Sequence, residues 1–85
     1  MPEICRFYGI SIFIYHDDLA PPHFHARYAE LRITVELVSG LIEGRFPRRA
    51  VRLVLEWHEE HRKELEEDWA LAASGQALKR IAPLE

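Results

Sequence analysis

The spacing of apolar residues changes once along this chain, at Pro47, and this change limits the fold more than any other feature of the sequence. Before Pro47, apolar and polar residues alternate, which is the two-residue period of half-buried strands. After Pro47, apolar residues recur every three or four positions, which is the period of a helix. Strands followed by helices in only 85 residues predict a single α+β domain, with a small antiparallel sheet of three to five strands and C-terminal helices packed on one face.

The strand-rich half of this domain spans residues 1–46. Three of its segments share the alternating pattern: 10–15, 23–28 and 31–37. β-Branched residues are frequent in the third segment, as is usual in strands. Shorter strands are expected at 4–7 and at 41–43, the latter after a turn at Ser39-Gly40.

A two-residue turn at Ala29-Glu30 would place the segments 23–28 and 31–37 side by side as a hairpin. The apolar residues then face each other on the buried side of the sheet: Phe24 with Val35, Ala26 with Ile33, and Tyr28 with Leu31. The polar residues pair on the open side: His23 with Glu36, His25 with Thr34, and Arg27 with Arg32. A shift by one residue would put Arg or Glu into the core, so the pattern favours this register.

The helical half spans residues 47–74 and ends near Ser74-Gly75, because glycine suits the position after a helix terminus. One continuous helix over 48–73 would be roughly 39 Å long, whereas a compact chain of this size has a radius of gyration of roughly 12 Å. We therefore expect a bend near His58 to His61. The tail, residues 75–85, is expected to pack on the core.

The charge balance limits the classes of partner. A net charge of −3 argues against binding nucleic acid over the whole surface, which requires many phosphate contacts. Six arginines lie between residues 27 and 52, and six acidic residues lie between residues 59 and 68, so the molecule is expected to have ends of opposite charge and a charged partner. A single cysteine, no secretory pattern and no run long enough to span a bilayer favour a cytoplasmic protein.

Residues 15–28 hold most of the chemically versatile side chains, including three of the five histidines. Glu36 beside His23 would fix the tautomer of that imidazole, as acid–base chemistry requires. His23, His25 and Glu36 are therefore the candidate catalytic residues.

Arg27 and Arg32 would repel each other unless an anion such as a phosphate or a carboxylate lies between them. Phe13 and Tyr15 fall on the same face if their strand lies beside this pair. These four residues are the candidate binding residues, because aromatic rings beside Arg and His suit a single-stranded nucleotide or a protein partner.

Less specific interpretations stay open. His23 and His25 can equally be solvated residues of an exposed strand. Two imidazoles at alternate strand positions can also ligate zinc, and the residues able to complete such a site are His16, Asp17 and Asp18. No metal and no other cofactor is assigned. His58 and His61 lack the spacing of zinc proteases, so they are expected at the helix–sheet boundary with hydrogen-bonded nitrogens, and Trp57 and Trp69 are expected in the core.

Several motifs follow one another along nearly the whole chain: Ile4-x-Arg6-Phe7-Tyr8-Gly9-Ile10, Pro21-Pro22-His23-Phe24-His25-Ala26, Leu53-Val54-Leu55-Glu56-Trp57, His61-Arg62-x-Glu64-Leu65, and then Trp69 and Pro83-Leu84. In this order they resemble the bacterial family called domain of unknown function 4160. The chain departs from the family's usual pattern in lacking a glycine in the turn between Tyr28 and Leu31. The resemblance implies no assigned reaction, and it implies a gene in a compact two-gene module similar to a toxin–antitoxin pair.

The leading hypothesis is a small cytoplasmic partner-binding component of a bacterial toxin–antitoxin-like module, acting through the surface formed by His23, His25, Arg27 and Arg32. Its partner would be a small protein encoded nearby, or RNA. No interaction with a membrane is expected. The alternative is a metal-independent ribonuclease-like enzyme with His23 and His25 as acid and base. A homodimer formed through the long helix is left open, and a metal-binding module ranks third.

Overall fold

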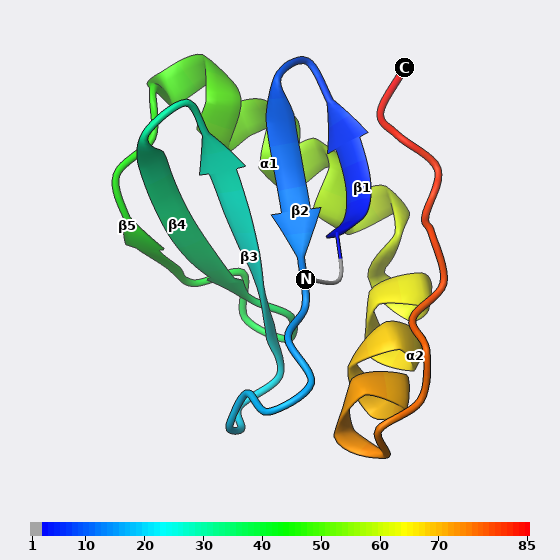
Figure 1. The fold of residues 1–85 in the computed structure, drawn as a ribbon. Coiled ribbons are helices and arrows are strands. Elements are labelled where there is room, and N and C mark those ends of the chain that lie inside the picture. The colour runs from blue at the N-terminus through cyan, green and yellow to red at the C-terminus, as the bar shows by residue number, and fades with distance from the viewer. Residues whose placement is uncertain (1–2) are drawn as a thin grey trace.

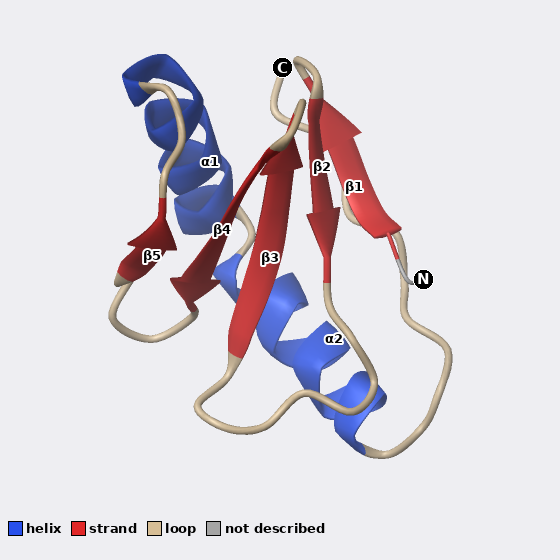
Figure 2. Cartoon of the chain, turned by 60° about the vertical axis from the view of Figure 1, so that its left-hand side comes forward, coloured by secondary structure: helices blue, strands red, loops and turns tan. Residues whose placement is uncertain are grey.

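Five strands form one antiparallel sheet in the computed structural model, which describes residues 3–85. Their order in the sheet is their order in the chain (Figure 1): β1 (Glu3–Phe7), β2 (Ile10–Phe13), β3 (His23–Tyr28), β4 (Leu31–Glu36) and β5 (Ile42–Gly44). Two helices follow, α1 (Arg48–Glu60) and α2 (Arg62–Ala73). The predicted α+β class is confirmed, since both helices lie on one side of the sheet (Figure 2).

The register between β3 and β4 is the predicted one, from His23 opposite Glu36 to Tyr28 opposite Leu31. The turn between these strands contains no glycine, and Ala29 takes a positive φ of 54°. That conformation costs a residue with a side chain roughly 1–2 kcal/mol. The two-residue hairpin forms nevertheless, because its register buries the side chains of the core face, each worth about 1.5–3 kcal/mol when large and apolar.

The strand β2 is shorter than predicted, because it ends at Phe13 rather than at Tyr15. Ile14 is still fully buried, so the alternation continues one residue past the last strand pairing. Residues 14–22 then form a loop that leads from β2 to β3 and lies beside α2 in both views (Figures 1 and 2). This loop brings polar residues to the end of the sheet where β3 begins.

The helical half bends at His61, as its length predicted. His61 has φ −124° and ψ 26°, which are not helical values, and its backbone N–H is shared between the carbonyls of Trp57 and His58. With this bend the chain keeps a radius of gyration of 11.6 Å. The second helix stops as expected at Ser74 and Gly75, where Gly75 takes a φ of 74°.

The core lies between the sheet and the helices, and Trp57 stands at its centre. This side chain is fully buried and packs against the rings of Phe7 and Phe24, with centroid distances of 5.5 and 5.7 Å. None of the helices within residues 3–85 has the length and apolar character needed to cross a membrane.

The tail is held by contacts with both layers. The indole N–H of Trp57 donates a hydrogen bond to the carbonyl of Ala82 at 2.8 Å, and the N–H of Ile81 donates to the carbonyl of Ile4, also at 2.8 Å. Ile81 and Leu84 are buried in the core. The tail therefore runs along β1 (Figure 1) and covers that edge of the sheet.

Candidate functional site

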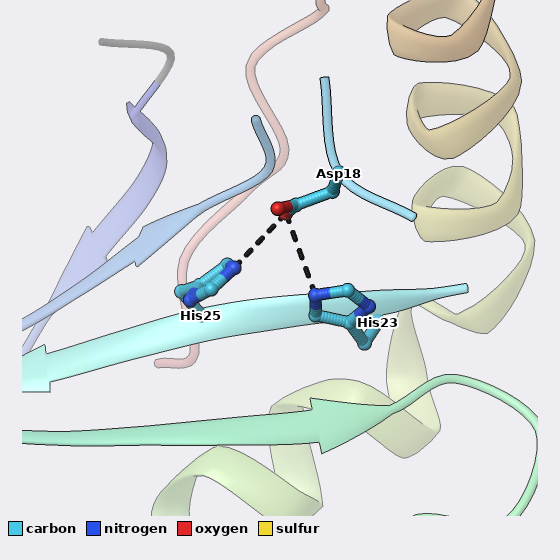
Figure 3. Close-up of side chains that lie close together, drawn as sticks. All are labelled: Asp18, His23 and His25. Carbon is cyan, nitrogen blue, oxygen red and sulfur yellow. Dashed lines mark hydrogen bonds and ion pairs between the residues drawn. The ribbon is translucent and has the colours of Figure 1, made fainter. Parts of the chain in front are cut away.

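Asp18, His23 and His25 meet at the end of the sheet where β3 begins (Figure 3). The two histidines occupy alternate positions of β3, so both imidazoles project from the same face, with ring centroids 5.1 Å apart. Asp18 comes from the 14–22 loop and points its carboxylate between them (Figure 3). Its Oδ2 lies 3.0 Å from Nε2 of His25 and 3.4 Å from Nε2 of His23.

A backbone carbonyl fixes the tautomer of His23. Nδ1 of this ring lies 2.8 Å from the carbonyl oxygen of Pro21, and because a carbonyl only accepts hydrogen bonds, Nδ1 carries the hydrogen. In a neutral imidazole Nε2 then carries a lone pair, which faces the Asp18 carboxylate. Two acceptors in such proximity repel each other, and a cation bound between them would relieve this repulsion.

Aromatic rings from two other segments support the imidazoles. The ring of Tyr15 meets that of His25 edge-on at a centroid distance of 4.6 Å, and Trp69 of α2 lies 5.4 Å from the ring of His23. The side chains of Asp18, His23 and His25 remain 22%, 21% and 29% exposed. The cluster is therefore held firmly and partly shielded, yet it stays accessible from solvent.

The prediction that Glu36 fixes the tautomer of His23 is wrong, since the carbonyl of Pro21 does so. Glu36 faces His23 across the strands as expected, but its carboxylate accepts a hydrogen bond from Oγ of Ser39 at 2.7 Å. The carboxylate that contacts His23 belongs to Asp18, which the sequence suggested only as a metal ligand. The prediction failed for two reasons. The turn after β4 places the hydroxyl of Ser39 beside the carboxylate of Glu36. The 14–22 loop follows no periodic pattern, so its path to His23 could not be predicted from the sequence.

The arginine pair lies on the same face as the histidines, towards the hairpin end. Arg27 and Arg32 are directly opposite each other, and both side chains are exposed. The arginine salt bridges within residues 3–85 are made by Arg6, Arg62 and Arg80. In the described part of the chain, the two facing guanidinium groups therefore have no carboxylate partner.

Phe13 and Tyr15 lie beside this pair, as predicted, with their rings stacked at 6.1 Å. Phe13 is only 8% exposed, so a ligand would meet Tyr15 first. These rings, together with His25, Arg27 and Arg32, line a hollow of about 20 Å³. A hollow of this size admits about one water-sized group.

The remaining histidines have partners of their own. His16 lies 2.9 Å from the carbonyl oxygen of Gln76 and is not a third member of the cluster. His58 is buried, with Nε2 3.0 Å from the carbonyl oxygen of Leu37, and burial lowers its pKa from the ordinary value of 6.5. His61 hydrogen-bonds to a glutamate in the first turn of α2. The expectation of a hydrogen-bonded residue at the helix–sheet boundary is confirmed for His58. His61 is hydrogen-bonded as expected, and it packs on Trp57 of α1.

Two further buried groups lie outside the cluster. Burial raises the pKa of the Cys5 thiol, so this cysteine remains protonated and is a poor nucleophile. Asp68 of α2 accepts a hydrogen bond from the backbone N–H of Lys79 at 2.9 Å, and burial raises its pKa. The hydrogen bond between Asp68 and Lys79 fastens the tail, and both buried groups lie away from the open face of the sheet.

Two residues of the site were missed or misplaced by sequence reasoning. Trp69 was expected in the core; it packs against the core but is only half-buried, and it also contacts His23. Asp18 was one of three candidates for a third ligand, and its position as the common partner of both histidines follows only from the fold. The signal that pointed in the right direction was the short distance in sequence between Asp18 and the two histidines.

Fold and site together define a small α+β protein whose open sheet face carries a His–Asp cluster at one end and an arginine pair at the other. The family model described as "Domain of unknown function (DUF4160)" matches residues 9–70. Because the match covers most of the 85 residues, this chain belongs to that family, as its motifs suggested. No curated protein and no solved structure shows a significant similarity to the chain.

Proposed function

We propose that this protein is the partner-binding component of a bacterial toxin–antitoxin-like module, and that it binds an acidic segment of a small cytoplasmic partner protein on the open face of its sheet. The observation that carries this proposal is the arginine pair. Arg27 and Arg32 face each other, exposed and without a carboxylate partner in residues 3–85. Like charges directly opposite on a sheet destabilise it, and an anion bound between them would remove that cost.

The hollow beside the arginine pair is small. It measures about 20 Å³ between Tyr15, His25 and the two guanidinium groups, which is room for about one water-sized group. A carboxylate bound across the two guanidinium groups, with one oxygen in the hollow, would make the strongest type of hydrogen bond that arginine makes.

The charge distribution also favours a protein over RNA. The net charge is −3, and α2 presents a run of exposed acidic side chains: Glu64, Glu66 and Glu67. A nucleic acid extending along the molecule would be repelled there, whereas a short acidic peptide segment needs only the arginine pair.

The proposal is tested by charge reversal. The tagged product of the adjacent gene is expressed together with the wild-type chain, with Arg27→Glu/Arg32→Glu, and with the control Arg62→Glu, which changes an exposed arginine of α2. We expect the double variant to be lost from the complex, because each hydrogen bond to a charged group contributes about 1.5–3 kcal/mol, and the control to be retained. Undiminished binding of the double variant would place the contact elsewhere, and a nuclease-sensitive complex would assign the face to RNA.

One observation favours a second candidate function, the metal-independent cleavage of RNA. Asp18 orients His25 through a 3.0 Å contact, which is how a carboxylate prepares a histidine for acid–base work. Against this function, both Nε2 atoms point to one carboxylate oxygen, whereas in-line displacement at phosphorus needs groups on opposite sides. Cleavage of RNA in the presence of EDTA that is lost in His25→Ala would support it, and no cleavage by the wild type would exclude it.

A further inference from the structure

We propose that Asp18, His23 and His25 form a binding site for one divalent transition-metal ion, for which Zn²⁺ is the best fit. The site shares His25 with the hollow beside the arginine pair. Its other two residues lie away from that pair, since His23 begins β3 and Asp18 belongs to the 14–22 loop (Figure 3). Metal binding here neither requires nor excludes the partner-binding function proposed above. The inference depends on three features of the cluster: the distances between its atoms, the tautomer of His23 and the chemistry of the donors.

The distances match a site that needs little rearrangement. Two ligands each about 2.1 Å from a zinc ion lie roughly 3.4 Å apart in tetrahedral geometry. Oδ2 of Asp18 lies 3.4 Å from Nε2 of His23 and 3.0 Å from Nε2 of His25. All three ligand atoms lie within 4.8 Å of one another. Rotation of the imidazoles of His23 and His25, together with a small shift of the Asp18 carboxylate, would bring the separations to that value.

The tautomer of His23 is the one that a metal ligand requires. Nδ1 donates its hydrogen to the carbonyl of Pro21 at 2.8 Å, which leaves the lone pair of Nε2 directed into the cluster. A hydrogen bond from the second ring nitrogen to a backbone carbonyl is the usual support of a metal-bound histidine. A doubly protonated His23 would also satisfy Asp18, so a proton is the competing occupant, and the experiment must separate the two.

The donor set selects the class of ion. Two imidazoles and one carboxylate suit zinc and its neighbours among the first-row metals, whereas Ca²⁺ and Mg²⁺ prefer sites built from oxygen alone. Three protein ligands also leave a fourth position for water or for a group of another molecule. Trp69 and Tyr15 beside the rings would shield the ion on two sides.

The experiment uses the full untagged chain, stripped with EDTA and dialysed, and titrated with ZnCl₂ by isothermal calorimetry at pH 7.5. Asp18→Asn and His25→Gln each remove one ligand. His16→Ala is the matched control, because His16 is a neighbouring exposed histidine that contacts Gln76 rather than the cluster. Circular dichroism of each variant in EDTA establishes that it folds without metal. The absorption spectrum of the Co²⁺-substituted protein reports the coordination geometry.

We expect the wild type and His16→Ala to bind one equivalent of zinc. A supporting hydrogen bond alone is worth about 10–100-fold in metal affinity, so we expect each loss of a ligand to weaken binding by at least about 100-fold. The melting temperature of the wild type should rise by roughly 10–20 °C when free zinc exceeds the dissociation constant a hundredfold. Absence of stoichiometric zinc binding by the wild type would overturn the inference, as would equal affinity in Asp18→Asn and His25→Gln, and the cluster would then be an Asp–His ion pair held by a proton.

Discussion

Reversing one charge of the facing arginine pair should make the free protein more stable. Arg27 and Arg32 are cross-strand partners on the open face, and neither has a carboxylate partner within residues 3–85. Like charges directly opposite each other destabilise a sheet and opposite charges stabilise it, each by about 0.2–1 kcal/mol. Arg32→Glu replaces the repulsion between two like charges by an attraction between opposite charges.

The size of the gain follows from the exposure of the pair. Both side chains are exposed, so water and salt reduce each contribution towards the lower part of its range. The sum is about 0.5–1 kcal/mol, and for a domain of this size 1 kcal/mol corresponds to roughly 4–8 °C in melting temperature. Arg32→Glu should therefore melt about 2–8 °C higher than the wild type at low salt.

The assay is thermal denaturation followed by circular dichroism at about 20 mM and 1 M NaCl, because the screening length falls to roughly 3 Å at 1 M. The gain should shrink at high salt. Arg27→Glu/Arg32→Glu, which restores a pair of like charges, should melt close to the wild type. An unchanged or lower melting temperature of Arg32→Glu at low salt would refute the idea that this pair is held in mutual repulsion.

Three further predictions concern pH and the backbone. Burial lowers the pKa of His58, so the unfolded chain binds more protons below about pH 6.5; the free energy of unfolding should fall as the pH decreases from there, and urea denaturation of His58→Gln should show a weaker fall. Burial raises the pKa of Asp68 above 3.8, so the folded state binds this proton more tightly than the unfolded state does. The free energy of unfolding therefore falls as the pH rises and Asp68 becomes charged. Asp68→Asn lacks this charge, so its stability relative to the wild type should increase between pH 4 and 7 in the same assay. Gly44 has a φ of 106°, and a Cβ there would lie 2.4 Å from the carbonyl oxygen of Arg32, so Gly44→Ala should lower the melting temperature clearly more than Gly40→Ala, whose Cβ meets nothing within 4 Å.

The strand register could be predicted from the sequence because a wrong register has a large cost. In the hairpin of β3 and β4, moving the pairing by one residue would bury Arg27 or Glu36, and burying a charge without a partner costs several kcal/mol. The bend at His61 was predictable for a different reason, since a straight helix over 48–73 is longer than a compact chain of this size allows. The cost of burying a charge and the size of a compact chain each act on many residues together, so both outcomes could be predicted.

The partners within the site could not be predicted in the same way. The 14–22 loop carries no hydrophobic period, so nothing in the sequence decides whether Asp17, Asp18 or His16 turns towards β3. The position of Trp69 beside His23 depends on how α2 is rotated after the break at His61. Glu36 was assigned to His23 from strand pairing alone, and the hydroxyl of Ser39 takes its carboxylate instead. Each of these outcomes depends on a single contact.

The measurement that tests the central claim most directly is the affinity for the purified protein encoded by the adjacent gene, determined by calorimetry at two salt concentrations. The claim is that Arg27 and Arg32 together bind an acidic segment of that protein. We predict that the wild type binds with an affinity that decreases at high salt, and that Arg27→Glu/Arg32→Glu binds at least about 100-fold more weakly while Arg62→Glu is unaffected. Equal affinities of the wild type and the double variant at low salt would contradict the claim.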